Sequence, residues 1–348
     1  MHADLRLQLI HDWLHLDLGW SGFSVVPASA DASFRRYFRV SHQGRSHIVM
    51  DAPPDKEDVR PYLAVSDLLA GAGVHVPEVQ ARDTARGLLL LEDLGHTHLL
   101  TALQAGGDPD ALYTDALVAL AGLQCRGAAV AAQLPPYDAA VLRREMQLLP
   151  DWYLARHLQQ PLTAAEQSLW EDTQALLLRE IEAQPRVFVH RDYHSRNLMV
   201  TGERSPGVID FQDALHGPAA YDLASLLKDC YVAWPRARLE AWVAQFRALL
   251  QEQGPHGAAL AGPDLATHLR WLDMVGLQRH LKVLGIFARL FWRDGKPGYL
   301  DDLPRTLAYV REAAGLHPEL AAFRDFVDTR LAPGLEAANA RARAAAVS

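Results

Sequence analysis

Cysteine is scarce in this chain: Cys125 and Cys230 are the only two among 348 residues. Two cysteines provide neither a disulfide framework nor a zinc-binding pattern. Because small proteins of oxidising compartments commonly carry such frameworks, the shortage favours a reducing compartment. We therefore expect a cytoplasmic protein.

Long apolar runs are also missing, most clearly in the first 20 residues. Asp4, Arg6 and Asp12 interrupt the apolar positions there, and no cationic start precedes them. The segment therefore predicts neither a signal peptide nor a membrane span, and we expect no membrane partner. The spacing of Ile10 and Trp13 suits an amphipathic helix instead.

The chain has no excess of positive charge. Lys and Arg total 34 against 42 Asp and Glu, which gives a formal net charge of −8. Nucleic-acid-binding domains usually carry a basic surface, so we expect no nucleic acid partner. With 49% hydrophobic and 22% charged residues, the composition is that of a globular protein with a sizeable core in two lobes.

The hydrophobic pattern changes in character along the chain. Strands are expected at residues 24–28, 34–40, 46–50 and 87–92 and near residue 79, with one helix at 58–70. Helical spacing follows at residues 110–124, 143–157, 164–183, 221–231, 239–253, 264–292 and 303–314. The sequence thus predicts an α+β protein with a small β-rich N-lobe, residues 1–95, and a larger, mainly helical C-lobe, residues 96–348.

Residues 190–197, with the sequence His-Arg-Asp-Tyr-His-Ser-Arg-Asn, form the most informative stretch. A short apolar strand at 187–190 leads into it, and a hairpin of 198–200 with 208–209 follows. Asp192 and Asn197 have the spacing of the catalytic loop H-R-D-x-x-x-x-N of phosphoryl-transfer enzymes. We predict that Asp192 is the base that orients an acceptor hydroxyl and receives its proton.

Two residues are predicted magnesium ligands. Asn197 offers an amide oxygen, and Asp210 offers a carboxylate at the end of an apolar run. Mg²⁺ prefers hard oxygen ligands and is usually held by one or two protein groups together with phosphates. Asp213 fits three roles, as an auxiliary ligand, a substrate contact or a solvent-facing acid. Asp222 begins a helix, where we expect it to accept hydrogen bonds from loop amides.

Glu92, Asp93 and Leu94 follow a very apolar strand and have two interpretations. In one, the C=O of Glu92 and the N–H of Leu94 bind an adenine edge as an interlobe hinge. In the other, the segment is a plain linker, because composition alone does not separate a hinge from a linker.

The catalytic motif with its flanking segments resembles the aminoglycoside phosphotransferase/choline kinase family. The resemblance lies in residues 190–192 with Asn197, in the strand end at 209–211 and in the helix start at 218–226. It implies a bilobal protein-kinase-like fold, with a small antiparallel sheet in the N-lobe and a helical C-lobe. It also implies ATP and Mg²⁺ as cofactors.

A narrower resemblance points to the acceptor. Four stretches, residues 31–39, 90–95, 210–214 and 278–287, look like those of bacterial anomeric sugar kinases. That resemblance implies phosphorylation of the C1 hydroxyl of N-acetylmuramate and N-acetylglucosamine, small amino-sugar substrates, in cell-wall recycling toward UDP-N-acetylmuramate.

The sequence departs from the family pattern at two places. The phosphate loop at residues 29–34 has no glycine, so backbone N–H groups and Ser33, next to Phe34, would have to meet the phosphates. The third strand has no lysine. Arg35, Arg36 or Arg39 could supply the cation, and strand alternation puts Arg35 and Arg39 on one face and Arg36 on the other.

A stripe of four cations runs along the helix of residues 264–292 and just beyond it. Arg279, Lys282, Arg289 and Arg293 are spaced so that they share one helical face. Such a stripe is either a solvated basic face or part of a substrate site. In the second case, Arg279, Lys282 and Arg289 would suit the carboxylate of N-acetylmuramate and would repel cationic acceptors.

Two other functions stay open. A kinase for another small hydroxyl acceptor, of the aminoglycoside, choline or homoserine type, would use the same catalytic loop. A low-activity ATP-binding protein would explain the missing lysine and glycines. Against the second alternative, a binding module has no need to keep Asp192, Asn197 and Asp210 together.

Overall fold

The computed structural model describes residues 4–30 and 34–347, and these form two compact units. The first unit comprises Met1–Gly107 and Arg196–Asp213, and the second comprises Asp108–Ser195 and Ala214–Ser348. The expected N-lobe, residues 1–95, lies wholly within the first unit. That unit also includes residues 96–107 and the later segment Arg196–Asp213. A division of the chain at one boundary cannot describe a unit that is built from two separate segments.

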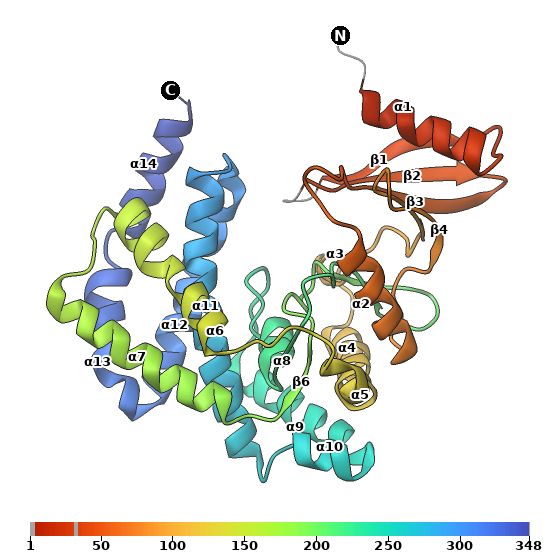
Figure 1. Cartoon of the computed structure of the whole chain (residues 1–348). Helices are drawn as coiled ribbons and strands as arrows, with labels where there is room; N and C mark the ends of the chain where they lie inside the picture. The colour runs from red at the N-terminus through yellow and green to blue at the C-terminus, as the bar shows by residue number, and fades with distance from the viewer. Residues whose placement is uncertain (1–3, 31–33, 348) are drawn as a thin grey trace. The chain divides into compact units, whose positions relative to one another are not determined.

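The first unit is built on a five-stranded antiparallel sheet in the order β1-β2-β3-β5-β4 (Figure 1). Its strands are β1 (Ser24–Ala30), β2 (Arg36–His42), β3 (Arg45–Asp51), β4 (Val79–Asp83) and β5 (Leu88–Glu92). All five predicted strands are confirmed to within a few residues. The unit also contains α2 (Arg60–Gly71), α3 (Leu99–Gln104) and the hairpin of β7 (Leu198–Met199) with β8 (Gly207–Val208).

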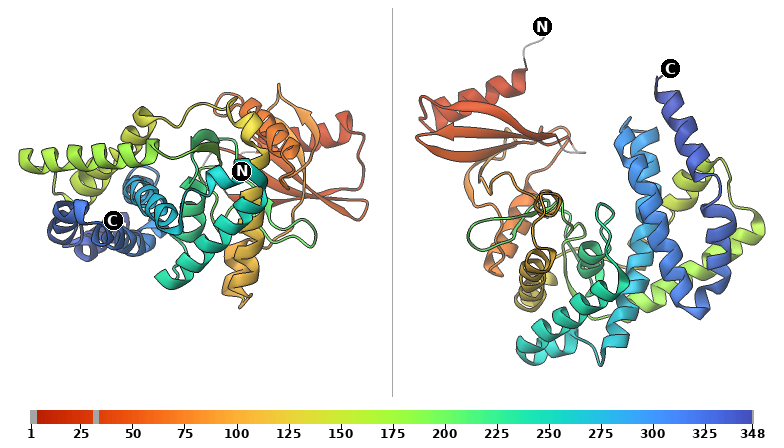
Figure 2. Two further views of the ribbon diagram at one scale, coloured as in Figure 1. Left: turned by 90° about the horizontal axis from the view of Figure 1, so that it is seen from below. Right: turned by 180° about the vertical axis from the view of Figure 1, so that it is seen from behind.

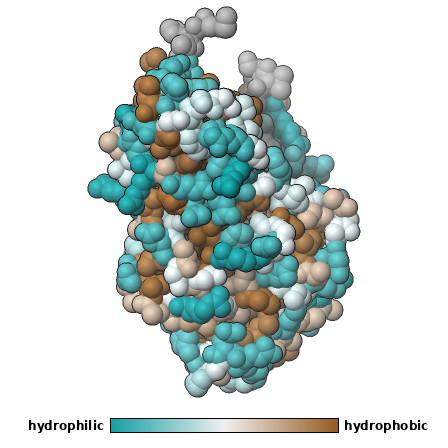
Figure 3. Space-filling view, turned by 90° about the vertical axis from the view of Figure 1, so that its right-hand side faces the viewer, coloured by the Kyte–Doolittle hydropathy of each residue, from teal (hydrophilic) through white to brown (hydrophobic). Residues whose placement is uncertain are grey.

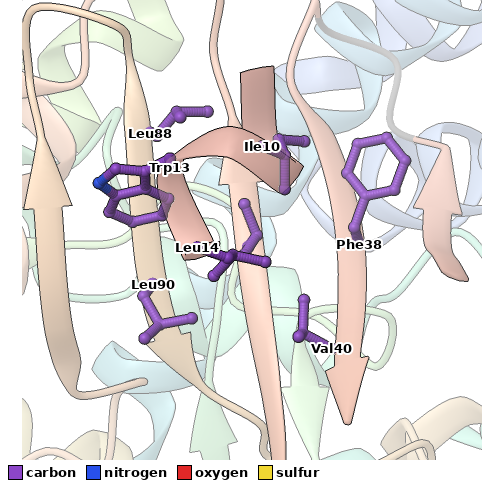
Figure 4. Close-up of a cluster of buried hydrophobic side chains, with 8 residues drawn as sticks. Ile10, Trp13, Leu14, Phe38, Val40, Leu88 and Leu90 are labelled. Carbon is purple, nitrogen blue, oxygen red and sulfur yellow. The ribbon is translucent and has the colours of Figure 1, made fainter. Parts of the chain in front are cut away.

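One face of this sheet is covered by the N-terminal helix α1 (Leu5–Asp12), which a π-helical turn (Trp13–Asp17) extends. Figure 4 shows Ile10, Trp13 and Leu14 packed against side chains of β2 and β5, each of the three at most 2% exposed. Burying a large apolar side chain contributes about 1.5–3 kcal/mol. The helix therefore forms the core of this face, as its amphipathic spacing predicted.

An ion-pair cluster fixes α1 to the same face. Asp51 of β3 is fully buried and accepts hydrogen bonds from Arg6 of α1 at 2.9 Å and from Arg36 of β2 at 3.0 Å. Arg36 also pairs with Asp4, which caps α1. Because side chains alternate along a strand, Tyr37 and Arg39 point to the opposite face of the sheet.

The second unit is mainly helical and surrounds one long helix, α11 (Leu265–Trp292) (Figure 2). This helix contacts α6, α7, α8, α9 and α12. The other helices are α4 (Pro109–Arg126), α5 (Ala128–Ala131), α6 (Ala139–Met146), α7 (Ala164–Glu182), α8 (Tyr221–Leu227), α9 (Arg236–Glu252), α10 (Gly254–Leu260), α12 (Leu303–Leu316), α13 (Ala321–Phe326) and α14 (Leu335–Val347).

Short irregular helices join these elements. The predicted helix at 143–157 is in fact α6 followed by a π-helix, Leu149–Leu158. A Cβ atom at Gly285 of α11 would lie 2.3 Å from the backbone of Leu148, so glycine permits the close approach at this junction. A second π-helix (Val327–Leu331) and two 3₁₀-helices (Pro297–Asp302, Pro318–Leu320) complete the set.

A two-stranded sheet in the second unit carries the catalytic motif. The strand β6 (Arg186–Val189) pairs antiparallel with β9 (Leu215–Pro218). The sequence predicts β6 but not its partner, because β9 contains glycine and proline, which read as loop. β6 ends directly before His190, so the sheet sets the starting point of the catalytic loop.

Hydrophilic and hydrophobic residues are interspersed on the face shown in Figure 3. Across the residues that the structure describes, no helix combines the length and the apolar character needed to span a bilayer.

Candidate active site

The backbone of the catalytic loop is fixed by a buried carboxylate. Asp222 at the start of α8 accepts hydrogen bonds from the backbone N–H groups of His190 at 2.7 Å and Arg191 at 3.0 Å, as predicted from its position. Burial nevertheless raises the pKa of Asp222 to about 7. Arg191 adopts φ 76°, a left-handed conformation that a non-glycine residue holds only when its surroundings enforce it.

The end of the loop in the second unit is anchored in the same way. Asp229 accepts a hydrogen bond from the Ser195 backbone N–H at 2.9 Å and another from its hydroxyl. Tyr193, between the two anchors, donates from its hydroxyl to the carbonyl of Ala116 at 2.9 Å. Asp192 therefore lies on a loop that is held on both sides.

Cations surround the predicted base. Arg279 of α11 approaches Asp192 at 3.7 Å, and the side chain of Asp192 keeps 44% exposure. Partial burial raises the pKa of Asp192, but the charges of Lys282 and Arg279 outweigh it and hold that pKa below its ordinary value. The carboxylate is thus ionised at neutral pH and able to accept a hydrogen bond from an acceptor hydroxyl.

The first unit contains a cavity of 310 Å³ on the sheet face opposite α1. It is lined by Ala28, Tyr37, Arg39, Ile48, Tyr62, Pro77, Leu91, Glu92, Asp93, Leu94, Gly95, His96, His98, Arg196, Asn197, Met199, Ile209 and Asp210. The lining mixes apolar side chains such as Ile48 and Leu91 with charged and polar ones such as Arg39 and Asp210. Apolar walls with placed polar groups are typical of a small-molecule site.

The predicted hinge lies along this cavity, which Glu92 and Leu94 both line. Arg39 donates to Asp93 at 2.6 and 3.0 Å and to the Gly95 carbonyl at 2.8 Å. Burial opposes ionisation of Asp93, yet the bonds from Arg39 and Ser46 lower its pKa to about 2. Arg39 therefore fixes the backbone path at Asp93 and Gly95, whether this segment is a hinge or a linker.

The two predicted metal ligands lie together in the first unit. Asn197 Nδ2 is 3.4 Å from Asp210 Oδ2, and both residues line the cavity. Asp210 has φ 63°, another left-handed non-glycine conformation, and its carboxylate binds Arg35 at 3.2 Å and Gln212 at 3.0 Å.

One amide and one carboxylate fit Mg²⁺, which takes few protein ligands when phosphates supply others. Within the described ranges, no cluster of three or more His, Cys, Asp or Glu could hold a metal ion.

The remaining predicted residues are placed unequally. Ser33 lies outside the described residues, and Phe34 is 64% exposed. Arg36 points to the face covered by α1, where it binds Asp51 and Asp4, and Arg35 lies at Asp210. Asp213 is exposed at the end of the first unit.

The four cations of the α11 stripe differ in their surroundings. Arg279 and Lys282 are buried, with side chains 5% and 8% exposed, and lie at Asp192 and Glu145. Arg293 pairs with Asp294 at 2.7 Å, whereas Arg289 is half-buried, and burial lowers its pKa. The stripe is therefore not a uniformly solvated basic face.

Sequence reasoning missed several residues of these sites. Tyr62 of α2 lines the cavity, and its ring lies 4.8 Å from that of Phe211. Glu145 of α6 binds both Arg191 and Lys282. A tyrosine or a glutamate on a helix is common, so nothing in the sequence marks Tyr62 or Glu145. Tyr37 also lines the cavity, and it could have been predicted, because strand alternation places its side chain on the same face as that of Arg39.

Comparison with protein families matches residues 24–261 to the model described as the phosphotransferase enzyme family. Named relatives of similar sequence cover nearly the whole chain. The N-acetylmuramate/N-acetylglucosamine kinase of Pseudomonas aeruginosa is 48% identical over 331 residues, which covers 92% of this chain and 96% of that protein. The protein of the same name from Neisseria meningitidis is 44% identical over 326 residues, covering 92% and 94%.

Solved structures are similar in fold. Plasmodium vivax ethanolamine kinase matches with a TM-score of 0.61 at 13% identity, covering 92% of this chain and 90% of that one. The GDP complex of wild-type aminoglycoside 2'-phosphotransferase-IIIa matches with a TM-score of 0.57 at 14% identity, covering 88% and 98%. The expected protein-kinase-like α+β fold is confirmed.

Proposed function

The chain belongs to the phosphotransferase enzyme family, and we propose that it is a kinase that uses ATP and Mg²⁺ to phosphorylate the anomeric (C1) hydroxyl of N-acetylmuramate and N-acetylglucosamine. The observation that carries the acceptor is the 44–48% identity, over 92% of the chain, to relatives named for these two sugars. The product would be a sugar 1-phosphate, which cytoplasmic cell-wall recycling would convert toward UDP-N-acetylmuramate.

In this proposal the nucleotide occupies the cavity of the first unit. The C=O of Glu92 and the N–H of Leu94 bind the adenine edge, and apolar side chains such as Ile48 and Leu91 enclose the base. The cation that replaces the missing third-strand lysine is Arg35 or Arg39, because Arg39 of β2 lines the cavity and Arg35, just before β2, binds the cavity residue Asp210. Arg36 has no place in this arrangement, since Asp51 and Asp4 already bind its guanidinium on the other face.

Asn197 and Asp210 would hold Mg²⁺ at the edge of the same cavity. The ion would neutralise charge on the phosphates during transfer. Arg35, which already binds the Asp210 carboxylate, would orient that ligand. Ser33, Phe34 and neighbouring backbone N–H groups stay candidates for phosphate contacts.

Asp192 in the second unit would act on the acceptor. Its ionised carboxylate accepts a hydrogen bond from the C1 hydroxyl and takes the proton late in phosphoryl transfer. The anchors at Asp222 and Asp229 support this role, because positioning supplies much of the rate in such reactions.

The stripe on α11 would recognise the acceptor. Arg279, Lys282 and Arg289 present positive charge on one face, which suits the carboxylate of N-acetylmuramate. N-acetylglucosamine lacks that carboxylate, so these residues would affect the two sugars differently. Asp213 is a weaker candidate for a sugar contact, since it lies exposed in the first unit.

The position of phosphorylation is tested with a methyl glycoside of N-acetylglucosamine, in which C1 carries no hydroxyl. We expect the wild-type protein to phosphorylate the reducing sugar and to leave the glycoside unchanged. Transfer to the glycoside at a normal rate would refute anomeric chemistry and favour a kinase for another hydroxyl. ATP turnover with none of a panel of amino sugars, choline, homoserine and aminoglycosides would favour a low-activity ATP-binding protein.

A further inference from the structure

We propose that Glu145 of α6 is a positioning residue for phosphoryl transfer, which holds Arg191 and Lys282 so that the Asp192 carboxylate keeps its working orientation. The inference rests on the proposed function, because it assigns Asp192 the role of base. It concerns contacts within the second unit alone.

Glu145 is the centre of a buried polar network. Its side chain is 8% exposed, and Oε1 lies 3.0 Å from Lys282 Nζ and 2.5 Å from Arg191 Nη2. Oε2 accepts a hydrogen bond from the Tyr137 hydroxyl and lies 3.4 Å from Gln278 Nε2. One carboxylate thus joins α6, the catalytic loop and α11.

The bond to Arg191 acts directly on the residue before Asp192. Arg191 holds a left-handed backbone conformation, and its backbone N–H already bonds to Asp222. The salt bridge to Glu145 fixes the side chain as well, so the residue is held at both ends. A change in Arg191 would be transmitted to Asp192 through a single peptide unit.

The bond to Lys282 acts through charge. Lys282 and Arg279 are one helical turn apart, and both stabilise the ionised form of Asp192. With Glu145 present, the Lys282 ammonium is bound to that carboxylate. Without it, the charge of Lys282 would still attract Asp192, and an ion pair formed there would compete with the acceptor hydroxyl.

The test is Glu145→Gln, which keeps the shape and removes the charge. We expect kcat for N-acetylglucosamine to fall about 100-fold, the loss typical of a misplaced reacting group. The KM for Mg-ATP should stay within about threefold, because the nucleotide site belongs to the other unit. The control is Asp273→Asn, which alters a buried carboxylate of α11 that lies 2.7 Å from Lys228.

The control separates positioning from stability. Both variants remove a buried anion, so both should lower Tm, but Asp273→Asn should keep kcat within about twofold. Equal losses of Tm with kcat unchanged in Glu145→Gln would overturn the proposal. If Glu145→Gln does not fold, Glu145→Asp keeps the charge and shortens the reach, and we expect it to show an intermediate kcat.

A double-mutant cycle tests the route through Arg191. Arg191→Gln breaks the same contact from the other end, so the double variant should lose no more than about threefold beyond Glu145→Gln. Fully multiplicative losses would show that the two residues act independently and would contradict the proposal.

Amide hydrogen exchange gives a readout that needs no acceptor. Glu145→Gln should increase exchange at residues 190–193 more than in α7, and an unchanged loop would count against the role of Glu145 whatever the substrate. Wild-type inactivity toward both sugars would instead refute the proposed function and leave the exchange result to decide the role of Glu145.

Discussion

In the first unit, charged side chains surround a cavity, whereas in the second they form a buried network around the catalytic loop. Arg39 lines the cavity with Glu92 and Asp210, where an incoming ligand can meet them. Glu145, Lys282 and Arg279 are at most 8% exposed, and the charges of Lys282 and Arg279 act on Asp192. The first arrangement suits recognition of a ligand, and the second suits positioning of a reacting group.

The largest effect is expected from Asp192→Asn. Removing the base should lower kcat for either sugar by about 10²–10⁴-fold, because the amide cannot accept the proton. Mg-ATP affinity, measured by calorimetry, should be nearly unchanged, since the cavity proposed for the nucleotide lies in the first unit. Near-normal turnover would remove Asp192 from its role, and a large loss of nucleotide binding would break the proposed division of tasks.

A comparable substitution in the first unit should also lower activity, but with a different dependence on Mg²⁺. Asp210→Asn should weaken the proposed Mg²⁺ site, so activity should recover in part as Mg²⁺ is raised, whereas Asp192→Asn should not respond. The measurement is kcat/KM as a function of Mg²⁺ concentration for both variants. Identical Mg²⁺ dependence of wild type and Asp210→Asn would contradict metal binding by Asp210.

Substitutions on the two faces of β2 should differ in their effect on the KM for Mg-ATP, and we expect this effect to be smaller. Arg39→Gln removes charge-assisted bonds to Asp93 and Gly95 of the proposed hinge and should raise the KM for Mg-ATP about tenfold. Arg36→Gln, on the opposite face, should leave that KM within about twofold and lower Tm, because Asp51 loses a partner. Equal effects of both variants on KM would show that the sheet faces do not differ as proposed.

The smallest effect concerns stability against pH in the second unit. Burial lowers the pKa of His268 to about 4 and that of His280 to about 3, from an ordinary 6.5. Below pH 6.5 the unfolded chain takes up protons that the folded chain does not, so the free energy of unfolding falls as pH falls. Each histidine contributes up to about 1.4 kcal/mol per pH unit between 6.5 and its folded pKa.

Urea unfolding at pH 7, 6 and 5 measures this slope, and His268→Asn should reduce it. The raised pKa of Asp222 acts in the opposite direction over this range, so the comparison with the variant decides the matter. The same slope in wild type and His268→Asn would contradict a buried, neutral His268.

The sequence predicted those features of both units that depend on residues close together in the chain. Asp192, Asn197 and Asp210 are found by spacing along the chain, and the strands of the first unit by alternation. The same alternation separated Arg35 and Arg39 from Arg36, and the structure shows which face carries the cavity. Local patterns are sufficient to predict the strands, and they identify the candidate residues of a contiguous motif.

The buried network was beyond such reasoning. Glu145 is separated by 46 residues from Arg191, and nothing near it distinguishes it from a solvated helical glutamate. The cationic stripe on α11 was visible, but not the burial of Arg279 and Lys282, because burial depends on the helices that surround α11. Long-range packing fixes these residues, and single-sequence periodicity does not report it.

The most direct test of the central claim is the identity of the product. N-acetylmuramate is incubated with the protein, ATP and Mg²⁺, and the product is examined by ³¹P NMR. We predict a phosphate coupled to the anomeric proton, which identifies a sugar 1-phosphate. A phosphate on any other hydroxyl, or the absence of a sugar phosphate, would contradict the account.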